Sequence, residues 1–138
     1  MEDRIHLQVA TTGGPVYVGD VSVVQLPLED GYVGIMANHA PLLCAVVEGV
    51  LRATRADGIS EFIAVTRGLA HVADNQVSVL VNAAELAENI DLARAAAAEK
   101  RARAWLKAPA PDTDRVRAEA ALHRALARQA AVRMMKRK

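Results

Sequence analysis

The spacing of apolar residues changes once along the chain, near residue 89, and this change restricts the fold more than any other feature. Before it, apolar and polar residues alternate over short runs, as at Ile5, Leu7 and Val9. A period of two is typical of a strand with one buried face. After it, alanine-rich sequence with apolar residues three or four positions apart predicts helices. The chain of 138 residues is therefore expected to contain two units of different class.

The first unit, residues 1–86, has the pattern of many short strands. Apolar runs from Ile5 to about Val81 are separated by turn signals, among them Asp30-Gly31 and Asp57-Gly58. An aspartate followed by glycine between apolar runs favours a tight hairpin turn. Short strands at a spacing of roughly 8–12 residues predict an all-β sandwich or barrel. We expect an antiparallel β-sandwich.

The second unit, residues 87–138, is expected to be two helices joined by a short loop. The first helix is predicted from Leu92 to Leu106, after which Pro109 and Pro111 interrupt the helical pattern. The second is predicted from Arg115 to about Met135, and its expected apolar face consists of Leu122, Leu126, Ala130 and Met134. Both apolar stripes are narrow, so we expect an antiparallel hairpin that is marginal alone and able to redock. The predicted fold class is α+β.

Short polar side chains precede both predicted helices. Asn89 and Asp91 are candidate N-caps of the first helix. The candidates for the second helix are Asp112, Thr113 and Asp114. Their side-chain oxygens can accept hydrogen bonds from the free backbone N–H groups of the first helical turn.

Charge is distributed unevenly between the two units. Residues 1–85 contain 4 Lys+Arg and 10 Asp+Glu, a net charge of −6, whereas residues 86–138 contain 13 and 6, a net charge of +7. No apolar run reaches the roughly 20 residues that span a bilayer. Any membrane association is therefore expected to depend on a partner.

Several kinds of catalytic or metal site have no matching pattern. The glycines of Gly14–Gly19 have the spacing of a phosphate-binding loop, but Asp20 follows where the loop requires lysine. The four histidines lack metal-ligand spacing, so no metal site is expected. The single cysteine, Cys44, lies in an apolar run and is expected to be a buried structural thiol. The sequence predicts that the protein is not an enzyme.

A cluster of charged residues in the helical unit is the best candidate for ligand binding. Arg124 and Arg128 lie one turn apart on the second helix, and Asp91 and Arg94 lie at the start of the first. If the helices pack antiparallel, cationic side chains and a helix N-terminus can converge on an anion such as phosphate. The alternative is a solvated basic face with ion pairs inside each helix.

Nucleic-acid binding is a second interpretation of a basic helical hairpin. Trp105 is the only aromatic residue in the hairpin, and the preceding unit is acidic. Recognition by base stacking is therefore not favoured, since it needs several exposed aromatic side chains. An adaptor that binds nucleic acid through the hairpin is kept as the alternative function.

The sequence resembles the epsilon subunit of bacterial F-type ATP synthases over essentially its whole length. The resemblance rests on these motifs: Gly34-Ile35, His39-Ala40-Pro41-Leu42, Gly49-Val50-Leu51-Arg52, the segment from Glu61 to Leu69, Glu85, and Ile90-Asp91-Leu92-Ala93-Arg94-Ala95. Ala37-Asn38 replaces the Pro-Gly that is usual in the family, but asparagine tolerates the left-handed backbone that this bend requires.

The resemblance implies a non-catalytic rotor subunit of the central stalk. Its expected partners are the gamma subunit, the c-ring, and the alpha and beta subunits of the ATP synthase. It would couple rotation to the c-ring, and its C-terminal helices would inhibit ATP hydrolysis. The expected location is peripheral, at the cytoplasmic face of the bacterial inner (plasma) membrane.

The resemblance also implies two sets of functional residues. A regulatory ATP, but no required cofactor, is expected at Ile90, Asp91, Arg94, Ala95, Arg124 and Arg128. The segments Asp30-Gly31-Tyr32 and Asn38-His39-Ala40 are expected to lie together at the end of the sandwich that faces the c-ring.

Overall fold

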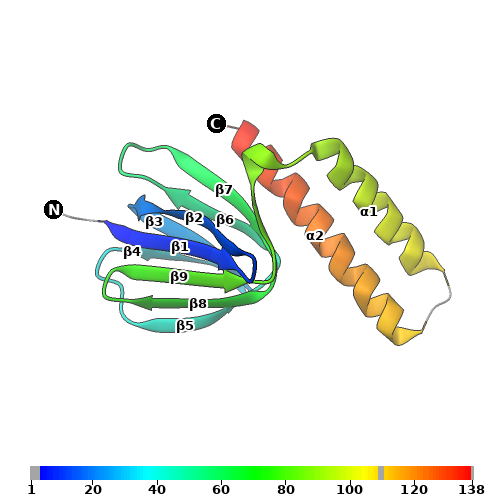
Figure 1. The fold of residues 1–138 in the computed structure, drawn as a ribbon, viewed down its shortest axis with the longest axis horizontal. Helices are drawn as coiled ribbons and strands as arrows, with labels where there is room; N and C mark the ends of the chain where they lie inside the picture. The colour runs from blue at the N-terminus through cyan, green and yellow to red at the C-terminus, as the bar shows by residue number, and fades with distance from the viewer. Residues whose placement is uncertain (1–3, 109–110, 138) are drawn as a thin grey trace.

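The computed structural model describes residues 4–108 and 111–137. Pro109, one of the two predicted helix breakers, lies outside these ranges. The described residues form a sandwich of two sheets, followed by two long helices that lie side by side at one end of it (Figure 1). No helix in these ranges is long and apolar enough to cross a membrane.

The first sheet contains five strands, most of which alternate between buried and exposed residues. Their order across the sheet is β2 (Gly14–Val21), β1 (Ile5–Thr11), β9 (Gln76–Val81), β8 (Gly68–Ala73) and β5 (Leu42–Val46). The pair β1–β9 is parallel, and the other pairs are antiparallel. The predicted β-sandwich is confirmed, and this one parallel pair is a detail that the sequence did not predict. No hairpin joins β1 to β9, so no tight turn fixes their relative direction.

The second sheet also contains five strands, and all its pairs are antiparallel. Their order is β10 (Ala84–Leu86), β7 (Ser60–Val65), β6 (Gly49–Thr54), β3 (Val23–Leu28) and β4 (Gly31–Met36). Gly34, part of one of the motifs shared with the family, lies inside β4. The inner faces of the two sheets bury a core that is rich in valine, leucine and isoleucine. The alternation seen in the sequence thus places the core between the sheets.

A short 3₁₀ turn, η1 (Ala87–Asn89), leads from β10 into the helices α1 (Leu92–Lys107) and α2 (Asp112–Lys136). Asp91 caps α1, since its carboxylate accepts a hydrogen bond from the backbone N–H of Arg94 at 3.1 Å. For α2 the expected N-cap is wrong. The helix begins at Asp112, and Pro111 takes the cap position without a side-chain hydrogen bond. Asp112 and Asp114 lie in the first turn, where their negative charge interacts favourably with the helix dipole and stabilises the helix.

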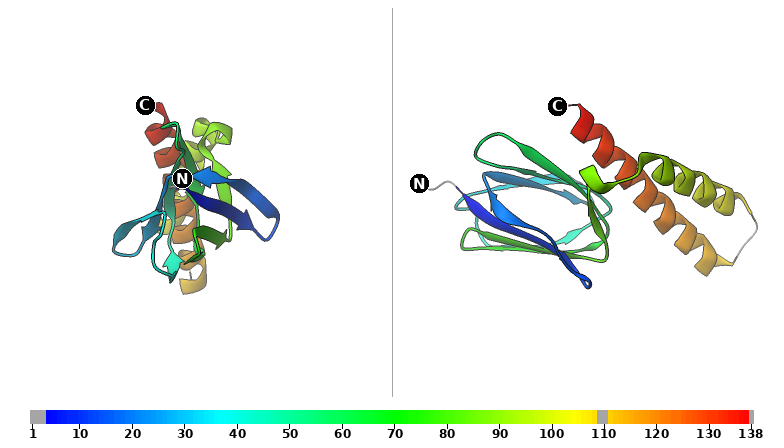
Figure 2. Two further views of the ribbon diagram at one scale, coloured as in Figure 1. Left: turned by 90° about the vertical axis from the view of Figure 1, so that its left-hand side faces the viewer. Right: turned by 45° about the horizontal axis from the view of Figure 1, so that its top comes forward.

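Helix α2 has two buried faces rather than the one that was expected. Its packing against α1 involves buried residues spaced by seven, which are Ala118, Ala125 and Val132 on α2 and Ala95 and Ala102 on α1. Its other face covers Val50, Phe62 and Ala64 on the outer side of β6 and β7 with Ala127 and Ala131. The predicted face at Leu122, Leu126, Ala130 and Met134 is only partly buried, because it lies at the edge of this contact. Figure 2 shows α2 between α1 and the strands.

Candidate functional site

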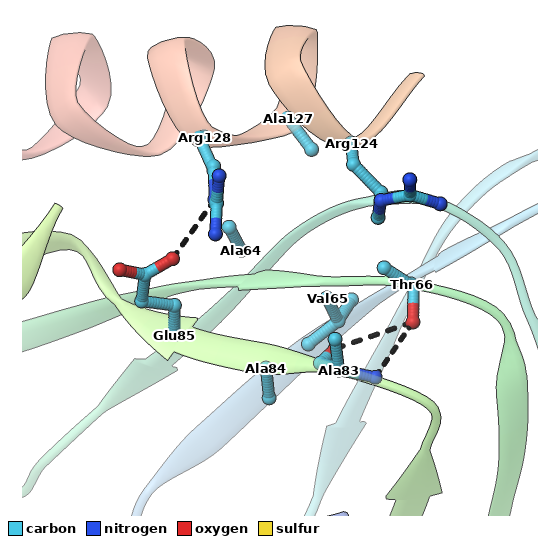
Figure 3. Close-up of a pocket in the computed structure, with 9 residues that line it drawn as sticks. All are labelled: Ala64, Val65, Thr66, Ala83, Ala84, Glu85, Arg124, Ala127 and Arg128. Atoms are coloured by element: carbon cyan, nitrogen blue, oxygen red, sulfur yellow. Dashed lines mark hydrogen bonds and ion pairs between the residues drawn. The ribbon is translucent and has the colours of Figure 1, made fainter. Parts of the chain in front are cut away.

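The contact between α2 and the sandwich contains an ion pair and a slot. Arg128 donates from Nε to Oε1 of Glu85 on β10 at 2.9 Å. Figure 3 shows these side chains pointing toward one another, with Arg124 one helical turn away and directed elsewhere. The slot beneath the arginines has a volume of about 100 Å³, and its floor is formed by residues of β7, β10 and the segments that follow and precede them. It is lined by Ala64, Val65, Thr66, Ala83, Ala84, Glu85, Arg124, Ala127 and Arg128.

Arg128 also borders two further cavities. The first has a volume of about 110 Å³, lies at the start of α1, and is lined by Glu85, Asn89, Ile90, Asp91, Arg94 and Arg128. The second is a groove of about 220 Å³ between the helices, lined by Ala98, Arg101, Ala102, Trp105, Ala121, Arg124, Ala125 and Arg128. We call the three cavities together the arginine groove.

The structure brings together most of the predicted ligand-binding residues. Ile90, Asp91, Arg94 and Arg128 line one cavity, and Arg124 lines the other two beside Arg128. Ala95 does not belong to the lining, because its side chain is only 1% exposed and is buried in the hairpin. Contact of Ala95 with a ligand therefore stays a prediction that this lining does not support.

Two further residues that line the arginine groove were not predicted from the sequence. Arg101 and Trp105 lie one turn apart on α1 and line the cavity between the helices. The signal was available, since Arg101 is seven residues after Arg94 and so lies on a similar face of the helix. What the sequence could not supply was the side of α1 that packs against α2.

Electrostatics makes the arginine groove suitable for an anion. Four guanidinium groups line it, those of Arg94, Arg101, Arg124 and Arg128. Within residues 4–108 and 111–137, Arg128 is the only one of the four that forms an ion pair. Guanidinium groups bind phosphate with strong, charge-assisted hydrogen bonds. The groove can therefore recognise a phosphate-bearing ligand.

The predicted partner-binding segments do not lie together. Asp30 precedes β4 and Asn38-His39-Ala40 follows it, so the two segments stand at opposite ends of a six-residue strand. At about 3.3 Å per residue, the strand separates them by roughly 20 Å. The expectation that both segments lie at one end of the sandwich is therefore wrong. The sequence showed both turns but not the direction in which β4 runs.

The loop after β4 has a well-defined local geometry. Asn38 adopts the left-handed backbone that its residue type predicts, with φ of 67°. Its N–H donates to the side-chain oxygen of Asn75 at 2.6 Å, which ties the loop to the turn between β8 and β9. The ring Nδ1 of His39 lies 2.7 Å from the carbonyl oxygen of Ala40. A loop held in this way presents its exposed residues on a stiff support.

An exposed apolar patch lies on the outer face of the first sheet. Leu69 on β8 is paired with Leu80 on β9 and with Ala45 on β5. Leu43 lies two residues before Ala45 and therefore on the same face of β5. The exposed fractions of Leu43, Leu69 and Leu80 are 67%, 55% and 57%. Contiguous exposed leucines on a rigid sheet are typical of a protein–protein interface. We call Leu43, Leu69 and Leu80 the leucine patch.

The remaining candidates for chemistry give no site. No three His, Cys, Asp or Glu side chains within residues 4–108 and 111–137 are close enough to hold a metal ion. Cys44 is partly rather than fully buried, and this burial raises the pKa of its thiol. A raised pKa leaves less of the nucleophilic thiolate form.

Two family descriptions together match nearly the whole chain. Residues 4–87 match the beta-sandwich domain of the ATP synthase delta/epsilon chain. Residues 88–133 match the long alpha-helix domain of the same chain. The two matches meet between β10 and the helices.

Curated relatives are similar over most of the chain. The ATP synthase epsilon chain of Symbiobacterium thermophilum is 48% identical over 105 residues, which cover 76% of this chain and 75% of the relative. That of Bacillus velezensis is 41% identical over 124 residues, covering 90% and 93%. That of Nitratidesulfovibrio vulgaris is 40% identical over 128 residues, covering 93% and 95%.

A solved structure has a similar fold. A chain in the structure of the Euglena gracilis mitochondrial ATP synthase, which contains OSCP, F1 and the c-ring, aligns with a TM-score of 0.84 at 24% identity. The alignment covers 96% of the present chain and 83% of that chain. The sandwich and the two helices are thus arranged alike in both.

Proposed function

Because the chain belongs to the delta/epsilon chain family of ATP synthase, as an epsilon chain, we propose that it works as a non-catalytic rotor subunit of the central stalk. In this role it transmits rotation between the gamma subunit and the c-ring. It occupies a peripheral position at the cytoplasmic face of the bacterial membrane. Membership of the family leaves the nucleic-acid adaptor without an observation in its favour.

The leucine patch supports a permanent interface with the gamma subunit. Its three leucines lie on the sheet that α2 does not cover, so the patch is exposed while the hairpin is docked. Burying a leucine side chain stabilises an interface by about 1.5–3 kcal/mol. With this sheet against the gamma subunit, one end of β4 faces the c-ring. The structure of the sandwich is compatible with either end in that position.

The proposed regulatory function is inhibition of ATP hydrolysis by the helical hairpin. The observation that carries it is the composition of the docking surface. The sandwich is covered by Ala127 and Ala131 with partly buried Met134 and Met135, and by one exposed ion pair. Small side chains bury little apolar area, and an exposed ion pair contributes about 0–1 kcal/mol. Such a hairpin can leave the sandwich and contact the acidic segment of a beta subunit through its basic second helix.

Removing the second helix tests this function. Truncation after Lys107 deletes α2 and leaves the sandwich, whose core is separate from the hairpin contacts. The assembled ATP synthase with the truncated subunit is expected to hydrolyse ATP faster than the intact complex. Equal rates in two complexes with the same subunit content would show that the hairpin does not act as a brake.

The arginine groove supports a regulatory ATP site in the docked hairpin. The phosphates bind among Arg94, Arg124 and Arg128, and Ile90 offers the base an apolar contact beside Asp91. Asp91 keeps its role as the cap of α1, because a carboxylate does not attract phosphate. ATP bound there holds the hairpin on the sandwich, since two of the three cavities of the groove are lined by residues of both α2 and the sandwich.

A further inference from the structure

We propose a second anion-binding site, separate from the arginine groove, at the C-terminal end of α2. It is a cavity of about 240 Å³ between the helix and the sandwich, lined by Arg52, Phe62, Met134 and Arg137. Its ligand is a small oxyanion, inorganic phosphate, held between the two guanidinium groups. The site does not depend on the ATP site, and its regulatory consequence rests on the inhibitory function proposed above.

Arg52 supplies the first guanidinium from the outer face of β6. Its Nε donates to Oγ of Ser60 on β7 at 3.3 Å, and its Cζ lies over the ring of Phe62, 5.4 Å from the ring centre. It forms no ion pair with any residue that the structure describes. A guanidinium that is already held in place loses little further freedom when an anion binds to it.

Arg137 supplies the second guanidinium from the helical unit. It is the C-cap residue of α2, its side chain is exposed, and it too lacks an ion pair within residues 4–108 and 111–137. The C-terminal end of a helix carries a partial negative charge, which disfavours an anion. Arg133, Lys136 and Arg137 place three positive charges on and directly after the last turn, so the net charge at this end is positive.

Two like charges therefore face one cavity across the contact between α2 and the sandwich. Among the described residues no carboxylate lines this cavity, so nothing in that part of the chain offsets their mutual repulsion. An oxyanion between them replaces repulsion with attraction, because guanidinium groups bind phosphate oxygens through charge-assisted hydrogen bonds. The cavity has room for a tetrahedral anion with several water molecules. Bound phosphate thus fastens the C-terminal end of α2 to the sandwich.

The regulatory consequence is that docking of the hairpin responds to phosphate as well as to nucleotide. ATP in the arginine groove holds α2 around Arg124 and Arg128, whereas phosphate holds the helix end, nine residues after Arg128. Because phosphate is a product of ATP hydrolysis, accumulation of this product favours the docked hairpin.

Arg137→Gln in the full-length chain tests the site against Lys136→Gln. Lys136 is exposed, precedes Arg137 directly and does not line the cavity, so this control removes the same charge nearby. Sodium phosphate is titrated at constant ionic strength against sodium chloride, and the phosphorus NMR signal of the anion reports binding. Hydrogen exchange of the last-turn α2 amides reports attachment of the helix end. Arg124→Ala identifies any phosphate that binds in the arginine groove instead, and ATP is titrated in parallel.

The expected result is phosphate binding in the millimolar range that Arg137→Gln weakens by about five- to tenfold, between the scales of an exposed ion pair and of a hydrogen bond to a charged group. Lys136→Gln should weaken it by less than about twofold. Phosphate should slow exchange of the last-turn amides in the unaltered chain and not in Arg137→Gln. ATP affinity should be the same in both proteins.

Equal phosphate affinity of Arg137→Gln and Lys136→Gln would overturn the site, as would the absence of binding well above millimolar phosphate. Phosphate binding that Arg124→Ala abolishes and Arg137→Gln leaves intact would place the anion in the arginine groove and also overturn it. Binding at Arg137 without slower hydrogen exchange would overturn the fastening of α2. None of these results bears on the ATP site, whose failure appears separately as a lack of ATP binding by the unaltered chain.

Discussion

Gln129 of α2 donates its side-chain amide to Oε1 of Glu99 on α1 at 2.8 Å. Gln129 is only 8% exposed, and Glu99 also accepts a bond at 2.7 Å from Arg103 on its own helix. This polar contact joins the two helices within a seam that is rich in alanine, and the guanidinium of Arg115 on α2 makes a second one near the loop, to the carbonyl oxygen of Leu106 on α1 at 3.3 Å. Because other seam residues are small, the contact between Gln129 and Glu99 helps to fix the register of the hairpin.

The first prediction concerns the pH dependence of the hairpin. The hydrogen bond from Gln129, followed by that from Arg103, lowers the pKa of Glu99. A carboxyl whose pKa is lowered by folding stabilises the folded state above its unfolded pKa and loses this effect as pH falls through its folded pKa. The hairpin should therefore loosen below about pH 4, where an ordinary glutamate begins to protonate. Helix content measured by circular dichroism checks this, and the loss attributable to Glu99 should be absent in Glu99→Gln.

The second prediction concerns Gly68 at the start of β8. A Cβ on this residue would overlap the carbonyl oxygen of Leu80 and lie 2.6 Å from Cα of Val81. Since backbone atoms cannot move aside locally, Gly68→Ala should destabilise the sandwich by about 3 kcal/mol. Gly34→Ala is the matched control, because a Cβ there meets nothing within 4 Å. Thermal unfolding should separate the two variants, and similar midpoints would contradict the close approach.

The third prediction concerns the end of the sandwich that faces the c-ring. Tyr32 and His39 lie near opposite ends of β4, and we expect cysteine at only one of these positions to form cross-links with c-ring loops in the assembled complex. Cross-linking from both with equal yield would mean that β4 lies flat on the ring. Cross-links to alpha or beta subunits alone would rule out this placement of the sandwich.

The fourth prediction concerns the leucine patch. Leu69→Gln removes an apolar side chain that is 55% exposed and stands between two neighbours on the sheet. The isolated chain should keep its stability within about 0.5 kcal/mol, as is usual for surface substitutions. Binding to the gamma subunit should weaken by about 1.5–3 kcal/mol if this leucine is buried in the interface. Val116→Gln on α2 is a control, since Val116 is exposed but belongs to the hairpin.

The fifth prediction concerns nucleotide binding by the isolated chain. Arg124 and Arg94 line different cavities of the arginine groove. Changing either residue to alanine should weaken ATP binding by about 1.5–3 kcal/mol, which is the scale of a hydrogen bond to a charged group. Calorimetric titration with ATP measures this. Arg133→Ala, which removes an exposed cation of α2 outside the groove lining, should bind ATP like the unaltered chain. If all these variants bind ATP with the affinity of the unaltered chain, Asp91 and Arg94 serve only to cap the start of α1.

Local patterns in the sequence predicted the class of the elements and some of their boundaries. The alternation at Ile5, Leu7 and Val9 predicted a strand whose inward residues the structure buries. Asp91 was predicted to cap the first helix, and its carboxylate binds the N–H of Arg94. These features depend on neighbours within a few residues, which is the range over which backbone geometry and hydrogen bonding act without the rest of the fold.

The tertiary structure alone decided which surfaces meet. The sequence of α1 is rich in alanine on every side, so it could not show that Ala95 is buried while Arg101 and Trp105 line the groove. It also gave no sign that β1 runs parallel to β9. The partner of Arg128 is a residue of the sandwich, because the α2 surface that carries Ala127 and Ala131 packs on Phe62 and thereby brings Glu85 within reach. Such contacts join distant segments, and they follow from how apolar faces pack rather than from any local spacing of residues.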